Sequence, residues 1–117
     1  MNARRRALAR RYGERLAGLP VALPREAPDA YHVYHLYVIR TERRDALAEF
    51  LKTRGVQTGI HYPVPCHRQP AVEHLGAPPL PTTERVVREI LTLPLSAGHA
   101  EEEIDRVAAL VREFFGA

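Results

Sequence analysis

Residues 59–69, with the sequence GIHYPVPCHRQ, bring together two histidines, the single cysteine of the chain, a tyrosine and a glutamine. Such side chains can bind a metal ion, act as nucleophiles or form hydrogen bonds to a polar ligand. Each of these three chemistries requires a different spacing of the side chains along the sequence.

A metal site is the first possibility, because His61, Cys66, His67 and His74 lie within fourteen residues. Neighbouring residues such as Cys66 and His67 rarely bind one ion together, and the spacing matches no standard zinc motif. A second pair, His32 and His35, lies on a predicted strand and should face opposite sides of it. The sequence therefore predicts no metal site.

Nucleophilic catalysis by Cys66 is the second possibility, because His67 follows it directly. Catalytic pairs need side chains that converge in space, and adjacency in sequence usually points them apart. No predicted helix begins where it would activate the thiol, so we expect Cys66 to be a small buried apolar residue. The Gly-rich phosphate-binding motifs of nucleotide sites are also absent.

A polar small-molecule site is the third possibility, formed by His61, Tyr62, His67 and Gln69. Two prolines in the segment restrict its path, so that little entropy is lost in holding these side chains. Neutral imidazole both donates and accepts hydrogen bonds, which suits hydroxyl-rich ligands such as sugars. The alternative is a rigid surface loop in which Tyr62 packs down and the histidines are solvated, and residue types alone leave both open.

The elements that must position this segment can be read from periodicity. Apolar residues recur at helical spacing in 3–17, 41–56, 82–90 and 100–115, and residues 70–75 suit a single helical turn. Asn2, Thr41 and Thr82 are expected N-caps, and Gly55 is an expected left-handed stop. Residues 31–40, 56–60 and 91–95 read as strands, whereas the prolines of 19–30 indicate an extended connector. We expect an α/β two-layer domain with about three short strands, and the pattern leaves open whether they run parallel or antiparallel.

The expected buried stripes of the helices follow from the same spacing. They comprise Leu8, Tyr12 and Leu16 in the first helix; Leu47, Phe50 and Leu51 in the second; and Ile104, Val107, Ala108, Val111 and Phe114 in the last.

Length and charge bound the class of protein. A chain of 117 residues suits one domain, and it contains neither a secretory signal nor an apolar run of about 20 residues. One cysteine cannot form an internal disulfide, which makes the cytoplasm the expected location. The net charge is +3, and six arginines fall within residues 4–15. This cluster is either a nucleic-acid contact or a solvated helix face.

Several segments, in this order, resemble one family. They are YHLYVIR, then RDAL leading through GVQTGIHYPVPCHRQ, then the LPTTE that leads to ILTLPL. From about Asn2 to Phe115 the chain resembles the C-terminal part of the DegT/DnrJ/EryC1/StrS family, which comprises pyridoxal-phosphate-dependent sugar-nucleotide aminotransferases.

This resemblance implies the small C-terminal domain of a fold type I enzyme, with a short antiparallel sheet packed with helices. Residues 1–19 would be an inter-domain helix and 31–117 the small domain, while the large domain that binds pyridoxal phosphate would be absent. The family works as homodimers and transfers an amino group, commonly from glutamate, to a nucleotide-linked keto-sugar. A minority of its members catalyse other reactions, such as dehydration.

The cofactor of the family is bound covalently through a lysine of the large domain. Lys52 is the only lysine here and is offset from the buried stripe of its helix, so it matches no part of that site. We therefore expect this chain to bind no cofactor and to be inactive by itself. By the resemblance, His61, Tyr62, His67 and the weaker candidate Gln69 line the substrate cleft, without a catalytic role. The alternatives are a basic module that binds nucleic acid through Arg4–Arg15 and a regulatory or partner-binding stub.

Overall fold

The computed structural model describes residues 1–117, which form five α-helices, one 3₁₀ turn and two strands. Their order is α1 (Asn2–Leu16), β1 (Tyr37–Arg40), α2 (Arg44–Thr53), η1 (Cys66–Arg68), α3 (Pro70–Glu73), α4 (Pro81–Glu89), β2 (Ile90–Leu93) and α5 (Glu101–Phe114). All four predicted helices and the helical turn are thus confirmed, with boundaries shifted by a few residues. No helix has both the length and the apolar character that a membrane span requires.

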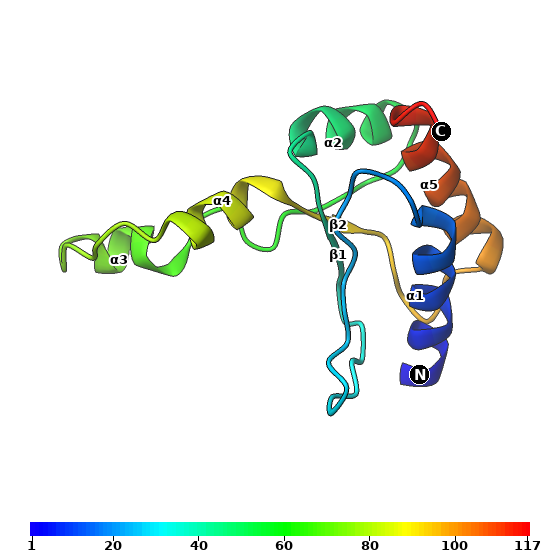
Figure 1. Ribbon diagram of the computed structural model, residues 1–117, viewed down its shortest axis with the longest axis horizontal. Coiled ribbons are helices and arrows are strands. Elements are labelled where there is room, and N and C mark those ends of the chain that lie inside the picture. The colour runs from blue at the N-terminus through cyan, green and yellow to red at the C-terminus, as the bar shows by residue number, and fades with distance from the viewer.

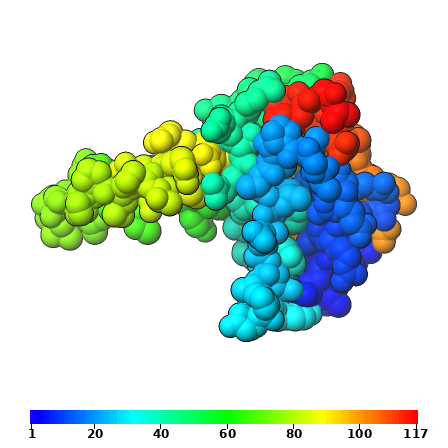
Figure 2. All heavy atoms as spheres, viewed as in Figure 1, coloured from blue at the N-terminus to red at the C-terminus, as the bar shows by residue number.

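The molecule has a packed body and two projections (Figure 1). The body consists of α1, α2, α5 and the sheet. One projection, which we call the arm, comprises residues 60–89 and carries η1, α3 and α4. The other is the 24–36 loop, which leaves the body in a different direction (Figure 2). The resulting outline measures 47 × 34 × 24 Å.

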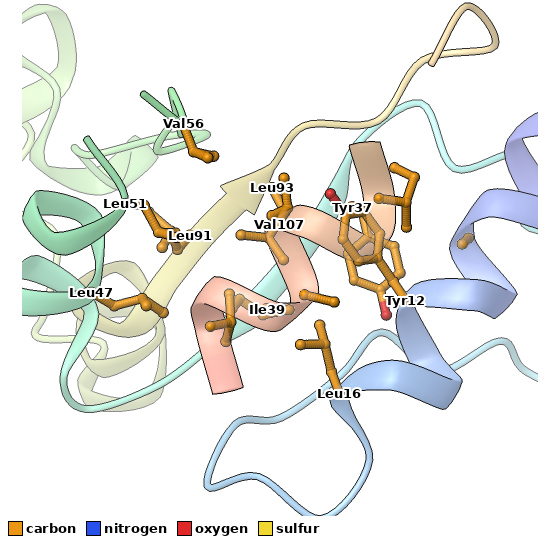
Figure 3. Close-up of a cluster of buried hydrophobic side chains, with 14 of the residues drawn as sticks. Tyr12, Leu16, Tyr37, Ile39, Leu47, Leu51, Val56, Leu91, Leu93 and Val107 are labelled. Atoms are coloured by element: carbon orange, nitrogen blue, oxygen red, sulfur yellow. The ribbon is translucent and has the colours of Figure 1, made fainter. Parts of the chain in front are cut away.

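The core lies where α1, α2 and α5 meet the sheet (Figure 3). The predicted stripes supply Leu8, Tyr12, Leu16, Leu47, Leu51, Ile104, Val107, Ala108 and Val111, all of them buried. The sheet adds Tyr37, Ile39, Leu91 and Leu93. Helix α1 packs on α5 within this one core. Its expected role as a connection between two domains stays a prediction.

The sheet has two antiparallel strands, so the prediction of three was wrong. Residues 56–60 form only a single bridge, in which Gly59 and Thr92 exchange backbone hydrogen bonds of 3.1 and 2.7 Å. The next hydrogen-bonded pair along β2 would need the N–H of Pro94, which proline lacks. In the other direction the chain turns away into the arm.

The predicted strand over 31–40 was too long, because only Tyr37–Arg40 pairs with β2. Tyr37 lies opposite Leu93, and the pairing of the two strands ends there. Residues 31–36 instead make local contacts: the Tyr34 N–H donates to His32 Nδ1 over 2.8 Å, and the two rings stack at 4.0 Å. Tyr34 has a φ of 49°, which is incompatible with a regular strand.

Of the expected helix ends, one is confirmed and the others differ. Gly55 ends α2 with a φ of 79°, as predicted. Thr41 was wrong as a cap, because α2 begins after Arg43; its hydroxyl instead accepts a hydrogen bond of 3.2 Å from the Arg43 N–H. Asn2 and Thr82 were wrong as caps, since each lies inside the first turn of its helix.

Candidate functional site

The segment singled out in the sequence begins at the base of the arm, beside an open cavity of about 390 Å³. Three stretches of chain meet there: the end of the 24–36 loop, the chain that enters the arm, and β2 with the residues that follow it. The lining residues are His35, Leu36, Gln57, Thr58, Gly59, His61, Thr92, Leu93, Pro94 and Leu95.

His61 is the only one of the four sequence-predicted site residues that lines this cavity. Its Nδ1 lies 2.8 Å from the Thr92 hydroxyl, and its Nε2 has no protein partner. The Tyr62 ring stands edge-on to the imidazole, with 5.5 Å between centroids. Tyr62 itself is 71% exposed, so it does not pack down as the surface-loop alternative required.

His67 and Gln69 lie farther along, within the arm, and both make contacts there. His67 is almost buried, and its Nε2 lies 3.0 Å from Glu84 Oε1 on α4. The side chain of Gln69 donates to the Val64 carbonyl over 3.0 Å. These two residues thus link parts of the arm to one another, and their part in ligand binding stays a prediction.

Glu84 is the centre of this network. It also accepts hydrogen bonds from the Arg68 guanidinium at 2.9 and 3.2 Å. The hydrogen bond from His67, and then those from Arg68, lower the pKa of Glu84 below its ordinary value. The carboxylate therefore remains charged over the whole neutral range and fixes η1 against α4.

Cys66 differs from the expectation. It is exposed at the start of η1 instead of forming part of an apolar core. No group of three or more His, Cys, Asp or Glu side chains lies close enough to hold a metal ion.

Two residues of the cavity were missed by the sequence analysis, His35 and Thr92. Thr92 offered a signal, because it is the one polar residue within ILTLPL and, on a strand, faces away from its apolar neighbours. His35 offered none, since its position depends on the irregular path of residues 31–36. Its imidazole has no hydrogen bond to the protein, so the cavity presents two imidazoles with uncommitted nitrogen atoms.

Larger hollows, of about 620 and 460 Å³, lie elsewhere on the surface. Some of their charged side chains are engaged within the protein: Arg40 binds Glu89 at 3.0 Å, and Arg106 donates to the Arg54 carbonyl over 2.8 Å. The smaller cavity at the arm base is the candidate for ligand recognition because it is the one that His61 lines.

Most arginines of the cluster on α1 form ion pairs within the fold. Arg11 and Arg15 both bind Asp105 of α5, at 2.6 and 3.1 Å. Arg4 binds Glu101 at 3.4 Å, and Arg6 pairs with Glu26. Four of the six guanidinium groups are thus engaged within the fold by three carboxylates, Glu26, Glu101 and Asp105.

Lys52 has the wrong surroundings for a residue that binds pyridoxal phosphate. It is exposed on α2, beside a shallow hollow that Asp45 and Glu49 also line. A lysine becomes nucleophilic near neutral pH through desolvation or a cationic neighbour, and this position offers neither. The residues of this chain therefore do not fit the covalent attachment of that cofactor.

Comparisons with known proteins show which enzymes this chain is similar to. The chain is 47% identical over 118 residues to the dTDP-3-amino-3,4,6-trideoxy-alpha-D-glucose transaminase of Streptomyces venezuelae, an alignment that covers 97% of this chain and 31% of that enzyme. The chain therefore spans about a third of the length of this curated relative.

Solved structures also match nearly the whole of this chain and about a third of the length of the other protein. The X-ray structure of S. venezuelae DesV in complex with a ketimine intermediate superposes with a TM-score of 0.94 at 45% identity, covering 99% of this chain and 32% of that one. Bacillus subtilis NtdA, solved with bound cofactor PMP, superposes with a TM-score of 0.86 at 32% identity, covering 99% and 28%.

A family model matches almost the whole sequence. It describes the DegT/DnrJ/EryC1/StrS aminotransferase family, and it covers residues 1–112. The resemblance carried by the sequence motifs is thereby confirmed, and this chain belongs to the DegT/DnrJ/EryC1/StrS aminotransferase family.

Proposed function

We propose that this chain is the small domain of a pyridoxal-phosphate-dependent aminotransferase that acts on nucleotide-linked keto-sugars. The observation that carries the proposal is the family match over residues 1–112. The S. venezuelae relative, whose name states an activity on a dTDP-linked amino sugar, supports the substrate class. In such an enzyme the bound cofactor supplies the electron sink for amino transfer.

Within that enzyme, the cavity at the arm base would form one wall of the substrate cleft. His61, His35 and Gln57 place hydrogen-bonding groups around it, and these groups suit the hydroxyl and carbonyl oxygens of a sugar. His61 would bind and orient the sugar and exchange no proton with it. Tyr62, His67 and Gln69 would contribute either directly or by shaping the arm.

The chain by itself would be inactive, since Lys52 does not fit the cofactor. The remaining two-thirds of the polypeptide, by comparison with the relatives, would supply the cofactor site, and α1 would connect to it. Seven of the eight exposed large apolar side chains support such a covering partner, because they gather on the two projections. They are Tyr31, Val33, Tyr62, Val64, Val72, Leu75 and Leu80. We expect the complete enzyme to be a homodimer.

A chimera tests the proposal. The matching segment of the S. venezuelae transaminase is replaced by this chain, and amino transfer on the dTDP-sugar is measured. We expect an active chimera, in which H61A raises KM for the sugar nucleotide roughly tenfold, the size of one lost hydrogen bond to a ligand, and changes kcat little.

His74 provides the matched control, because it is an exposed histidine of the arm without a hydrogen bond to the protein. H74A should leave both constants unchanged. A chimera that folds and binds cofactor but transfers no amino group would contradict the proposal. So would a borohydride-stable adduct of pyridoxal phosphate at Lys52 of the isolated chain.

A further inference from the structure

The imidazole of His61 is enclosed on one side by the bridge between Gly59 and Thr92. The two backbone hydrogen bonds of this bridge fix Gly59 beside β2. The ring then lies so close over Gly59 that a Cβ added there would be 2.7 Å from His61 Cε1 and 3.3 Å from Nδ1. Only glycine leaves room for the ring in this position.

Thr92 determines how the ring is held. Its side chain lies on the face of β2 opposite Leu91 and Leu93, and the residue is only 8% exposed. The hydroxyl has a single side-chain partner, His61 Nδ1, at 2.8 Å. A buried O–H group without an acceptor is unfavourable, so the arrangement that satisfies it has the Thr92 hydroxyl donating to Nδ1. The proton of the neutral imidazole is then on Nε2.

We propose that Gly59 and Thr92 are positioning residues that hold His61 as the Nε2–H tautomer, so that the cavity presents a hydrogen-bond donor to an oxygen atom of its ligand. The identity of that ligand as a sugar rests on the proposed function; the state of the ring does not. Recognition at this point would then favour a hydroxyl or carbonyl oxygen over an amino group, which offers protons of its own.

The tautomer can be measured directly in the ligand-free chain. Nitrogen-15 NMR at alkaline pH, where imidazole is neutral, distinguishes a protonated ring nitrogen from an unprotonated one. We expect the ratio of Nε2–H to Nδ1–H at His61 to be about fivefold higher in the folded chain than in the same chain unfolded in urea, the factor that one ordinary hydrogen bond provides. The same ratio in the folded and the unfolded chain, or an excess of the Nδ1–H form in the folded chain, would overturn the proposal.

His99 serves as an internal reference in the same spectrum. The Ser96 N–H donates to His99 Nδ1 over 2.9 Å, which also requires the Nε2–H form, but through a backbone donor. Thr92→Val keeps the shape of the side chain and removes the hydroxyl. It should return His61 to the ratio of the unfolded chain and leave His99 unchanged.

Two further variants separate positioning from general damage. Thr92→Ser should retain the wild-type ratio, because it keeps the hydroxyl. Gly59→Ala should displace the ring and lower the ratio as Thr92→Val does. If Thr92→Val and Thr92→Ser change the ratio alike, the hydroxyl has no role and the proposal fails.

The two proposals fail in different ways. If the His61 ratio behaves as expected but the chimera has no activity on the sugar nucleotide, the positioning of His61 stands and the proposed function fails. If the chimera depends on His61 but Thr92→Val leaves its ratio unchanged, the proposed function stands and the positioning by Thr92 fails.

Discussion

The body and the arm of this protein are held by different interactions. All fifteen residues of the hydrophobic core belong to the body or to the chain that leads from it, and none lies between residues 60 and 89. The arm instead depends on polar contacts, chiefly those that Glu84 makes with His67 and Arg68. The body should therefore unfold as one cooperative unit, whereas the arm should open locally at lower free energy.

Leucine truncation in each region tests this difference most strongly. Leu91 is fully buried in the sheet and Leu75 is 70% exposed on the arm. Leu91→Ala should lower the free energy of unfolding by about 2–5 kcal/mol, through lost burial and the cavity that it leaves. Leu75→Ala should change it by less than about 0.5 kcal/mol. Denaturant titrations would measure both, and comparable losses would mean that the arm belongs to the same cooperative unit.

The ion pairs between α1 and α5 should make the body sensitive to acid. The hydrogen bonds from Arg11, and then those from Arg15, lower the pKa of Asp105 to about 2. Because this pKa is depressed relative to about 3.9 in the unfolded chain, the stabilisation is present above about pH 4 and is lost as the pH falls toward 2.

Asp105→Asn should thus lower the melting temperature by a few degrees at neutral pH, and the difference from wild type should vanish near pH 2. Thermal scans between these limits would measure it. Asp29→Asn is the matched control, because Asp29 forms no ion pair and its substitution should change neither value. A difference that persists unchanged at low pH would show that charge is not the cause.

Glu84→Ala should have the smallest effect on global stability and a clear effect on the arm. Loss of the contacts to His67 and Arg68 frees η1 from α4, so amide exchange across residues 64–80 should become faster. The free energy of unfolding of the body should change by less than about 0.5 kcal/mol. Glu73→Ala, on α3 and without an ion pair, should leave exchange as in wild type. Unaltered exchange in Glu84→Ala would exclude Glu84 as the centre of the arm.

The helices of the body could be predicted because their apolar residues recur at the helical period. Leu8, Tyr12 and Leu16, for example, are all buried in the structure. Strand lengths could not be predicted in the same way, because pairing depends on a distant partner. Residues 31–36 have strand-like composition, but Tyr34 adopts a φ of 49° and the segment does not continue the pairing with β2.

The candidate site likewise has a part that could be predicted from the sequence and a part that could not. Residues 59–69 stood out by residue type, and His61 does line a cavity. Its partner Thr92 is 31 residues away in sequence, and the contacts of His67 and Gln69 within the arm depend on how η1 folds back against α4. Local spacing contains no information about either arrangement.

The bridge between Gly59 and Thr92 has a consequence for the length of the arm. It joins the two ends of the arm at one point of the sheet, so that the arm is a closed loop. The entropy of closing a loop grows only logarithmically with its length, and doubling the length costs roughly 0.6 kcal/mol. Insertions or deletions between residues 70 and 80, away from the contacts of Tyr62 and Glu89, should therefore be tolerated without moving His61. The arm could thus diversify during evolution while the bridge keeps this histidine in place.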